Sequence, residues 1–341
     1  MKKRRLVLKL EHVVVFLMFF LLIVSSFSTI VTYADSPAQI EGEWIQASDG
    51  RWWYRHTDGT YTTDGWEYIN GKWYHFDSSG WMQTGWLKVN STWYYLSSSG
   101  AMCTGWQSLN NYWYYFTSSG AMCTGWQYIN DHWYYFTSGG AMCTGWQYIN
   151  GSWYYLETSG AMRTIPYYTS TRHYEFFSSG QLRLTQLNVT RRQQERSQWC
   201  WVASAVMVGT RHSGISISQG LVVYYVKGIE GNYPGTLPET VSALYYASNN
   251  EIYGTSTSID NFPYSSAVAE IDDNQPFLIR MGWNSGGAHM VVGAGYDHED
   301  NSIYIIDPYG NCLSEYFGYY RLITGCTINS GQGRWTHTIY Y

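Results

Sequence analysis

Between residues 42 and 183, aromatic and polar positions recur with a period of 20 residues. Each unit holds a Gly-Trp pair, a second tryptophan seven residues later that opens a Trp-Tyr-Tyr/His-Phe/Leu run, and a closing Ser-Ser-Gly or similar turn. Alternating side chains within each run predict strands, and Asn70-Gly71 and Asn150-Gly151 predict hairpin turns. Because one such hairpin is too small to bury its own face, the pattern predicts a solenoid of stacked hairpins.

The units at both ends of this stretch are degenerate. Arg51-Trp52-Trp53-Tyr54 resembles a worn first unit, and residues 173–177 resemble a worn last one, with Ile165-Pro166 in place of Gly-Trp. Terminal repeats of a solenoid differ from inner repeats because they cap the stack. We therefore predict a repeat solenoid over 42–183, followed by a short linker at 184–192.

From residue 193 to residue 341 the hydrophobic pattern predicts a second domain. Two apolar runs of helical type come first, at 202–208 and 237–244. Three strand-like runs follow, at 277–281, 290–294 and 302–306. Helices first and strands later is the order of an α+β domain, so we predict an all-β hairpin solenoid followed by an α+β domain.

The first 34 residues have the pattern of a secretory signal peptide. Lys2-Lys3-Arg4-Arg5 is a positive segment, Val13 to Val24 is an unbroken apolar run, and Thr32-Tyr33-Ala34 offers small residues for cleavage. The alternative is a signal anchor, since the apolar stretch is nearly long enough to span a bilayer. We predict cleavage and secretion, after which no segment is expected to stay inserted in a membrane.

Composition narrows the partners. Charged residues make up 13% of the 341 residues, the net charge is −5, and no basic run follows the leader apart from Arg191-Arg192. Nucleic-acid binding and attraction to anionic membranes are therefore not expected. No Cys/His spacing matches a zinc site, so no metal or cofactor is expected.

The six cysteines do not form an obvious disulfide framework. Cys103, Cys123 and Cys143 fill the same slot in three consecutive repeats, which suggests repeat duplication. Cys312 and Cys326 lie close enough in the chain to pair. Cys200 is left over, as a catalytic thiol would be.

Four residues in chain order supply the parts of a cysteine hydrolase. Cys200 stands where the first helix would begin, and a helix N-terminus favours the thiolate that attacks a carbonyl. His289 can take and return a proton, and Asp307, which follows a strand, can orient the imidazole. Gln194, six residues before Cys200, can donate to a developing oxyanion.

Other residues compete for two of these roles. Asn284 and Asp297 are nearby alternatives to Asp307 as the group that orients His289. Gln193 competes with Gln194, and the six-residue offset favours Gln194.

Residues from about 190 to 341 resemble a papain-like cysteine peptidase of the compact bacterial branch, which includes plant-pathogen effector proteases and double-glycine leader peptidases. The resemblance rests on the Gln-x5-Cys spacing, the flanking Trp199 and Trp201, the segment from His289 to Asp297, and the Asp-Pro that follows. It implies Cys200 as nucleophile, His289 as base, Asp307 as orienter and Gln194 as oxyanion donor. Plant papain usually has asparagine as the third residue and small residues around the cysteine, whereas aspartate is expected in the compact branch.

The repeats resemble the choline-binding, or cell-wall-binding, repeats of Gram-positive surface proteins. The unit reads Thr-Gly-Trp-Gln-Tyr-Ile-Asn-Gly-Ser-Trp-Tyr-Tyr-Leu-Glu-Thr-Ser-Gly-Ala-Met in this chain. A quaternary ammonium has no hydrogen-bond donor, and aromatic cages hold it by cation–π attraction. We expect each cage to combine the two tryptophans of one unit with the second tyrosine of the next. Four predicted cages follow, namely Trp66/Trp73/Tyr95, Trp86/Trp93/Tyr115, Trp106/Trp113/Tyr135 and Trp126/Trp133/Tyr155.

A fifth cage is not expected, because the partner position is Glu175. Two alternatives stay open for the repeats. The aromatic side chains could form only the solenoid core, or they could stack on the sugar faces of a glucan instead of holding choline from teichoic acid.

Together these features predict a secreted cysteine endopeptidase that cleaves protein or peptide substrates and is held on a Gram-positive-type cell surface by its repeats. One rival is a peptidoglycan amidase or endopeptidase, because cell-wall cysteine hydrolases also use a Cys–His pair. The other rival is a non-enzymatic adhesin with an inactive peptidase fold.

Overall fold

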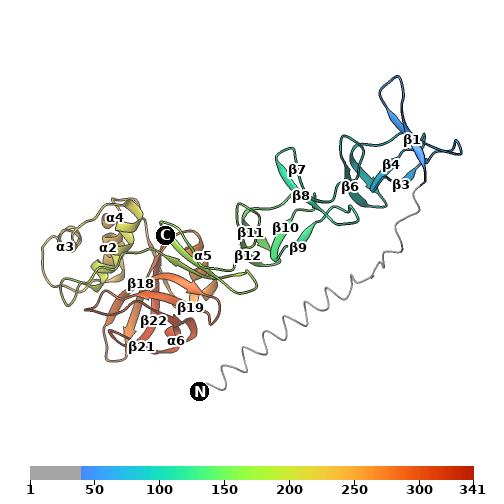
Figure 1. Cartoon of the computed structure of the whole chain (residues 1–341). Helices are drawn as coiled ribbons and strands as arrows, with labels where there is room; N and C mark the ends of the chain where they lie inside the picture. Colours follow the sequence, from blue (N-terminus) through green and yellow to red (C-terminus); the bar gives the residue numbers. More distant parts are fainter. Residues whose placement is uncertain (1–39) are drawn as a thin grey trace, which may run out of the picture. The chain divides into compact units, whose positions relative to one another are not determined.

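The computed structural model describes residues 40–341, which form two compact units, one ending at Cys123 and one beginning at Thr124 (Figure 1). The predicted signal peptide at 1–34 lies outside the described residues.

The first unit consists of antiparallel two-stranded hairpins, as the repeat pattern predicted. They are β1 (Gly42–Gln46) with β2 (Trp52–His56), β3 (Gly65–Ile69) with β4 (Lys72–Phe76), β5 (Gly85–Val89) with β6 (Thr92–Leu96), and β7 (Gly105–Leu109) with β8 (Tyr112–Phe116). In the turn between β3 and β4, Asn70 and Gly71 have φ values of 49° and 82°. Two successive positive φ values define the turn that matches the right-handed twist of paired strands, which confirms the hairpin prediction.

Each hairpin of this unit is tied to the one before it by the segment that follows its second strand. The backbone N–H of Met102 donates to the carbonyl of Trp73 at 2.8 Å, and Met122 repeats this bond to Trp93 at 2.8 Å. Between successive hairpins the packing is close, because a Cβ on Gly100 would lie 2.3 Å from the sulfur of Met82. Stacking, rather than any single hairpin, therefore buries the aromatic faces.

The second unit begins with two further hairpins, β9 (Gly125–Ile129) with β10 (His132–Phe136) and β11 (Gly145–Ile149) with β12 (Ser152–Leu156). The degenerate last repeat follows as β13 (Tyr167–Tyr168), β14 (Arg172–Phe176) and β15 (Leu182–Leu187). These three strands join one sheet of ten strands, in the order β13-β14-β15-β18-β17-β22-β16, with β19, β20 and β21 attached at its sides.

The predicted linker at 184–192 is therefore wrong over its first half. Leu184, Thr185 and Leu187 are buried in β15, which pairs with β14 on one side and with Tyr296 and its neighbours in β18 on the other. Of the predicted linker, residues 188–192 do lie outside strands and helices. The short polar-apolar run of this segment gives no sign of a distant partner strand, so only the folded chain reveals the pairing.

The remaining elements of the second unit follow β15 along the chain. They are α2 (Cys200–Ser213), α3 (Gln219–Lys227), α4 (Leu237–Ala247), β16 (Thr255–Ser258), the 3-10 helix η1 (Ile259–Asn261), α5 (Tyr264–Asp272), β17 (Phe277–Trp283), β18 (Ala288–Asp297), β19 (Ser302–Ile306), β20 (Glu315–Gly318), α6 (Tyr319–Thr324), β21 (Cys326–Ile328) and β22 (Gly331–Tyr340). Helices come first and most strands follow, which confirms the predicted α+β class.

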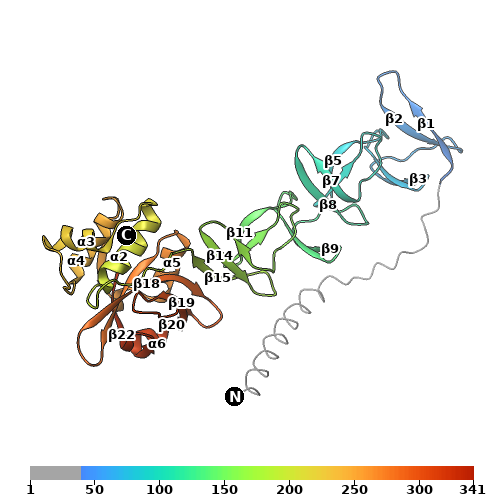
Figure 2. The same ribbon diagram turned by 60° about the vertical axis from the view of Figure 1, so that its left-hand side comes forward.

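Successive residues of the central strands face two different cores. Leu278 and Val292 pack with α2, α3 and α4, whereas Ile279 and Val291 pack on the other face with α5 and α6. Because both faces are covered, these strands read as continuous apolar runs in the sequence. Figure 2 shows α2, α3 and α4 gathered at one end of this domain and α6 at the opposite end.

The last repeat is expected to be part of the folding unit of the α+β domain. A fragment of residues 193–341 would expose the edge of β18, whereas a fragment of residues 164–341 keeps β13, β14 and β15. Loss of a buried strand costs several kcal/mol, so the shorter fragment should melt roughly 10 °C lower or aggregate through its open edge. Thermal unfolding followed by circular dichroism checks this, and equal melting temperatures for the two fragments would contradict it.

Candidate functional site

Cys200 is the first residue of the 14-residue helix α2, as the sequence predicted. Its thiol is partly exposed, while every residue from Trp201 to Gly209 is buried. Because the rest of this stretch is packed in the core, the helix holds Cys200 in a fixed position at the surface. Its N-terminal N–H groups favour negative charge at the sulfur.

Two tryptophans that flank Cys200 bind one surface loop. The indole N–H of Trp199 donates to the carbonyl of Gly231 at 2.8 Å, and that of Trp201 donates to the carbonyl of Tyr233 at 3.1 Å. The loop approaches closely, because a Cβ on Gly235 would lie 2.3 Å from the Trp201 ring. Both sides of the cysteine are thus held by the same loop, a role for these tryptophans that the sequence did not indicate.

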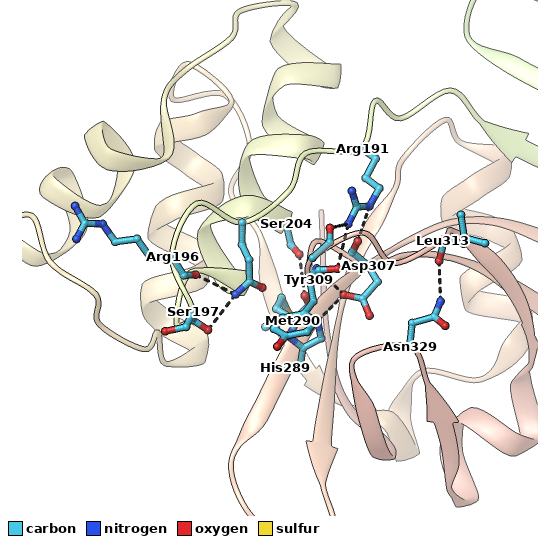
Figure 3. Close-up of polar contacts among 12 residues, drawn as sticks. Arg191, Arg196, Ser197, Ser204, His289, Met290, Asp307, Tyr309, Leu313 and Asn329 are labelled. Carbon is cyan, nitrogen blue, oxygen red and sulfur yellow. Dashed lines mark hydrogen bonds and ion pairs between the residues drawn. The ribbon is translucent and has the colours of Figure 1, made fainter.

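His289 lies near the start of β18, beside the end of the antiparallel neighbour β19. Its Nε2 is 2.7 Å from Oδ1 of Asp307, and both side chains are buried. Helix α2 is attached to the same strand, because the Ser204 hydroxyl donates to the carbonyl of Met290 at 3.0 Å. Ser204 is one helical turn beyond Cys200, so this bond, shown in Figure 3, holds the cysteine end of α2 against the histidine.

The electrostatics of this group favour a charged pair. Burial alone would lower the pKa of His289, but hydrogen bonds to Asp307 and Cys200 outweigh it and raise the pKa to about 9. Burial would raise the pKa of Asp307, yet the hydrogen bond to His289 and its charge keep that pKa below the usual value. Since Nε2 is bonded to Asp307, Nδ1 is the nitrogen left for Cys200. With a pKa of about 9 and Asp307 bonded to Nε2, the imidazole is protonated at neutral pH.

The loop after β19 fixes the carboxylate of Asp307. The backbone N–H of Tyr309 donates to Oδ1 at 2.9 Å. The Arg191 guanidinium donates to the carbonyl of Asp307 at 2.8 Å and to that of Gly310 at 2.7 Å. Figure 3 shows Arg191 reaching this loop from the opposite side to His289. Arg191, from the segment between β15 and α2, thus holds the carboxylate loop in place.

The two alternative orienting residues lie elsewhere. Asn284 is exposed, and its backbone N–H donates to the carbonyl of Gln332. Asp297 lies at the far end of β18 from His289, where its carboxylate is 3.3 Å from Arg183. The hydrogen bond to His289 is made by Asp307.

Aromatic rings enclose the imidazole of His289. The indole of Trp283 stacks on it with ring centroids 5.6 Å apart and planes 17° apart, and Tyr309 meets it edge-on at 6.3 Å. Trp283 ends β17, and a Cβ on Gly333 of the neighbouring strand would lie 2.7 Å from its ring. The sequence did not single out Trp283, because nothing in its spacing links it to His289 before β17 and β18 pair.

Gln194 is buried just upstream of α2, and its backbone N–H donates to the carbonyl of Pro308 beside Asp307. Its side-chain nitrogen donates to the carbonyls of Arg196 and Ser197, both at 3.0 Å. Its Oε1 has no hydrogen-bond partner within residues 40–341. The competing Gln193 is exposed. The structure thus brings Gln194 to the site with both amide hydrogens already bonded, so donation to an oxyanion would require one of these bonds to open.

In the first unit the aromatic side chains gather around each Gly-Trp tryptophan. The ring centroid of Trp86 lies 6.1 Å from that of Trp93, and the two ring planes meet at 90°. The centroids of Tyr95 and of Tyr114, from the next hairpin, lie 5.2 Å and 5.0 Å from that of Trp86. Trp86 and Tyr95 are cross-strand partners, so their side chains share one face of the hairpin with Trp93. The second unit repeats this arrangement around Trp126, with Trp133 at 6.3 Å, Tyr135 at 5.1 Å and Tyr154 at 4.9 Å.

The tyrosine contributed by the next hairpin differs from the prediction. Tyr94 meets Trp66 at 5.0 Å, while Tyr95 lies against Trp86 of its own hairpin. The other predicted tyrosines also lie against the Gly-Trp tryptophan of their own hairpin, namely Tyr115 against Trp106, Tyr135 against Trp126 and Tyr155 against Trp146. Adjacent strand residues point to opposite faces, and stacking turns the face of the first tyrosine toward the preceding hairpin.

Trp113 is the predicted cage tryptophan that departs most from an enclosed position. Its side chain is 47% exposed, although it meets Trp106 at 6.3 Å with the ring planes at 83°. The cross-strand partner of Trp113 is Ser108, which is too small to cover an indole. In the next hairpin the equivalent Trp133 has Tyr128 as its cross-strand partner, with ring centroids 5.2 Å apart. Tyr135 lies against Trp126 of its own hairpin, and because it belongs to the second unit, the combination Trp106/Trp113/Tyr135 stays a prediction.

The shift in the tyrosines creates a fifth aromatic set that the sequence did not predict. Trp146 lies 6.4 Å from Trp153, 5.1 Å from Tyr155 and 4.8 Å from Tyr174. Tyr174, and not Glu175, meets Trp146, so Glu175 does not occupy the aromatic partner position that the sequence analysis gave it. Tyr167 also stacks on Tyr155, with ring centroids 4.6 Å apart.

Neither disulfides nor clustered metal ligands occur within residues 40–341. Within that range all six cysteines are free thiols, so Cys312 and Cys326 are not paired. No group of three or more His, Cys, Asp or Glu side chains in that range is placed to hold a metal ion. Over the same range no helix has the length and apolar character needed to cross a membrane.

Two protein families match this chain. The choline-binding repeat family matches residues 63–104, 103–142 and 123–167. The Peptidase_C39 like family matches residues 186–336, which include all four candidate catalytic residues. A search of curated proteins finds no match.

Solved structures are similar to the chain as well. Choline binding protein F from Streptococcus pneumoniae is 40% identical over 42% of this chain and 51% of its own, with a TM-score of 0.39. The modular autolysin LytC from Streptococcus pneumoniae is 32% identical over 45% of this chain and 36% of its own, with a TM-score of 0.36. This chain thus spans about half the length of the first of these proteins and less of the second.

The two family matches agree with the two kinds of architecture seen in the fold. The hairpin repeats associate the protein with the cell wall or cell surface, and the α+β domain is of a peptidase type. The chain therefore combines choline-binding repeats with a C39-like peptidase domain, a pairing that supports a cell-wall-anchored peptidase or an autolysin-like function.

Proposed function

We propose that this protein is a secreted cysteine endopeptidase whose repeats hold it on choline of the cell wall. Cys200 is the nucleophile, His289 the acid and base, Asp307 the orienting group and Gln194 an oxyanion donor. The observation that carries the proposal is the buried hydrogen bond of 2.7 Å between His289 and Asp307, on a histidine whose other nitrogen serves a cysteine at a helix N-terminus. A peptide bond is the substrate class that the family match supports.

The reaction follows from the positions of the protons. The Cys200 thiolate attacks the carbonyl carbon of the scissile bond, while the imidazolium of His289 holds the proton on Nδ1. Collapse of the tetrahedral intermediate breaks the C–N bond, and that proton passes to the leaving amine. Neutral His289 then takes a proton from water, whose oxygen attacks the thioester and releases the acid and the thiolate. Asp307 stays ionised throughout and keeps Nε2 protonated.

The oxyanion can be held by two donors. The backbone N–H of Cys200 lies in the first turn of α2, where N–H groups have no acceptor within the helix. The second donor is the Gln194 amide, once it gives up its bond to Arg196 or Ser197. A donor placed in this way contributes about 3–4 kcal/mol of transition-state stabilisation in comparable acyl transfers.

Trp283 acts as a positioning residue in this proposal. Its ring lies nearly parallel to the imidazole of His289, so its face is turned toward a cation with a pKa of about 9. An aromatic face attracts a cation and also keeps water from the ring. Trp283 thereby supports the protonated form that donates to the leaving amine.

Replacing the nucleophile provides the first test. Cys200→Ala should lower peptide hydrolysis at least about 1,000-fold without changing the melting temperature, because the partly exposed thiol supplies chemistry and not packing. The matched control is Cys312→Ala, since Cys312 is another partly exposed thiol and burial raises its pKa. Iodoacetamide should label Cys200 before Cys312. Full activity in Cys200→Ala would exclude the assignment.

The substrate class is tested with the same pair of proteins. Wild-type enzyme should cleave members of a peptide library, and Cys200→Ala should cleave none. Clearing of purified cell walls by the wild-type enzyme, with no cleavage in the library, would instead identify an enzyme specific for wall peptides.

The pH dependence should report the raised pKa of His289. Since that pKa is about 9, the imidazolium persists through neutral pH, and kcat/KM should fall as pH rises through about 9. Asp307→Asn removes the carboxylate that raises this pKa, so the alkaline limb should move to lower pH by at least about one unit. Asp297→Asn, at the other end of β18, should leave the limb in place. An unchanged limb in Asp307→Asn would contradict the proposed role.

The fifth aromatic set predicts one additional choline site. Trp153→Ala should reduce the number of choline molecules bound per chain by one in equilibrium dialysis, because each cage needs its second tryptophan and one contact is worth roughly 0.5–2 kcal/mol. Tyr168→Ala is the control, since Tyr168 is exposed and stacks only on His173 among the ring contacts of the described residues. An unchanged number in Trp153→Ala would show that Glu175 does prevent binding. Retention on dextran that choline does not displace would favour a glucan ligand for the repeats.

A further inference from the structure

The helical end of the peptidase domain carries an open cavity that the proposed chemistry does not use. Its volume is about 560 Å³. Its lining comes from α3, α4 and the segment before β16, namely Tyr225, Val226, Val241, Ser242, Tyr245, Tyr253 and Gly254. None of these is a candidate catalytic residue, and the size is that of a pocket for a small ligand.

Tyrosines dominate the lining, and they leave ring surface uncovered. Tyr253 is 75% exposed, and its ring centroid lies 4.9 Å from that of Tyr245, with the two hydroxyl oxygens 3.4 Å apart. Tyr225 is exposed on one side and stacked on Tyr246 on the other, with centroids 4.1 Å apart and planes at 10°. These contacts preorganise the rings without covering them. Exposed aromatic faces beside fixed hydroxyl groups are typical of a recognition surface.

The charge of the cavity indicates a neutral ligand. No lysine, arginine, histidine or acidic residue lines it. The charged residues within three positions of the lining residues in the chain are paired, since Lys227 lies 2.7 Å from Glu239, and Glu251 lies 3.1 Å from His212. The rings also differ from the ammonium cages of the repeats, where two tryptophans meet at close to a right angle. The cavity thus offers phenol rings, hydroxyl groups and aliphatic side chains without a net charge.

We propose that this cavity binds a short segment of N-acetylated glycan. The apolar face of a pyranose ring can lie on Tyr253 or Tyr225, and its hydroxyl groups can bond to the phenol oxygens and to Ser242. The methyl of an acetamido group fits the aliphatic surface of Val226 and Val241. Because the choline-binding repeats associate the chain with the cell wall, a wall glycan is a polymer within reach of this domain. The site would add a contact to the wall that is independent of both Cys200 and the choline cages.

The test is a titration of the full chain with the tetramer of N-acetylglucosamine, in buffer with enough choline to saturate the repeats. Binding is followed by isothermal calorimetry. Tyr253→Ala should weaken binding about tenfold, which corresponds to about 1.4 kcal/mol, because the side chains whose removal costs most binding energy are enriched in tyrosine. The control is Tyr320→Ala, since Tyr320 is 74% exposed on α6, outside the cavity, and should leave binding unchanged.

Three results would overturn the proposal. They are absence of binding when choline saturates the repeats, equal binding by Tyr253→Ala and Tyr320→Ala, and displacement of the tetramer by rising choline concentration. Peptide hydrolysis is measured on the same variants and should not change in Tyr253→Ala. Tyr253→Ala should lose glycan binding and keep full peptide hydrolysis, whereas Cys200→Ala should keep glycan binding and lose hydrolysis. The two results together distinguish a failure of the glycan site from a failure of the proposed peptidase activity.

Discussion

The buried hydrogen bond between His289 and Asp307 is the constraint that organises the peptidase domain. A protonated imidazole and a carboxylate, both almost without solvent, are stable only where each satisfies the other. The antiparallel pairing of β18 and β19 brings the two side chains to the same end of the sheet. The backbone N–H of Tyr309 bonds the Asp307 carboxylate, and Arg191 bonds the backbone carbonyl of Asp307. Ser204 ties helix α2 to β18, the strand of His289. A buried ionic pair of this kind contributes little to stability, so its position is better explained by chemistry.

The wall-binding and peptidase parts of the second unit share hydrogen bonds. Strand β15 belongs to the last repeat by sequence and to the peptidase sheet by pairing. Arg183 reinforces the connection, with its guanidinium 2.6 Å from Glu175 of the repeat and 2.9 Å from Glu299 beyond β18. Arg172 adds a hydrogen bond of 2.7 Å to the carbonyl of Asp272 at the end of α5. A flexible linker would let the two parts move freely, whereas a shared sheet restrains the last repeat.

The repeat hairpins are stabilised by stacking on one another. A two-stranded hairpin alone is marginal in water, because one of its faces has nothing to pack against. Here the Gly-Trp tryptophan of one hairpin meets the first tyrosine of the next, so the packing contact and the wall of a ligand cage involve the same rings. A substitution of one of these rings would therefore change both the stacking of the hairpins and the proposed ligand cage.

The sequence by itself determined the type and order of most elements. Strict spacing predicted the hairpins, and apolar periodicity predicted α2 and the strands that carry His289 and precede Asp307. Both signals are local, because a turn or a buried face depends on residues close in the chain. Which partners meet was decided only by the tertiary structure. Tyr94 rather than Tyr95 faces Trp66, Trp283 covers His289, and residues 184–187 form a strand instead of a linker. Each depends on how separate strands or hairpins pack, and no pattern along one strand specifies the neighbour that will cover it.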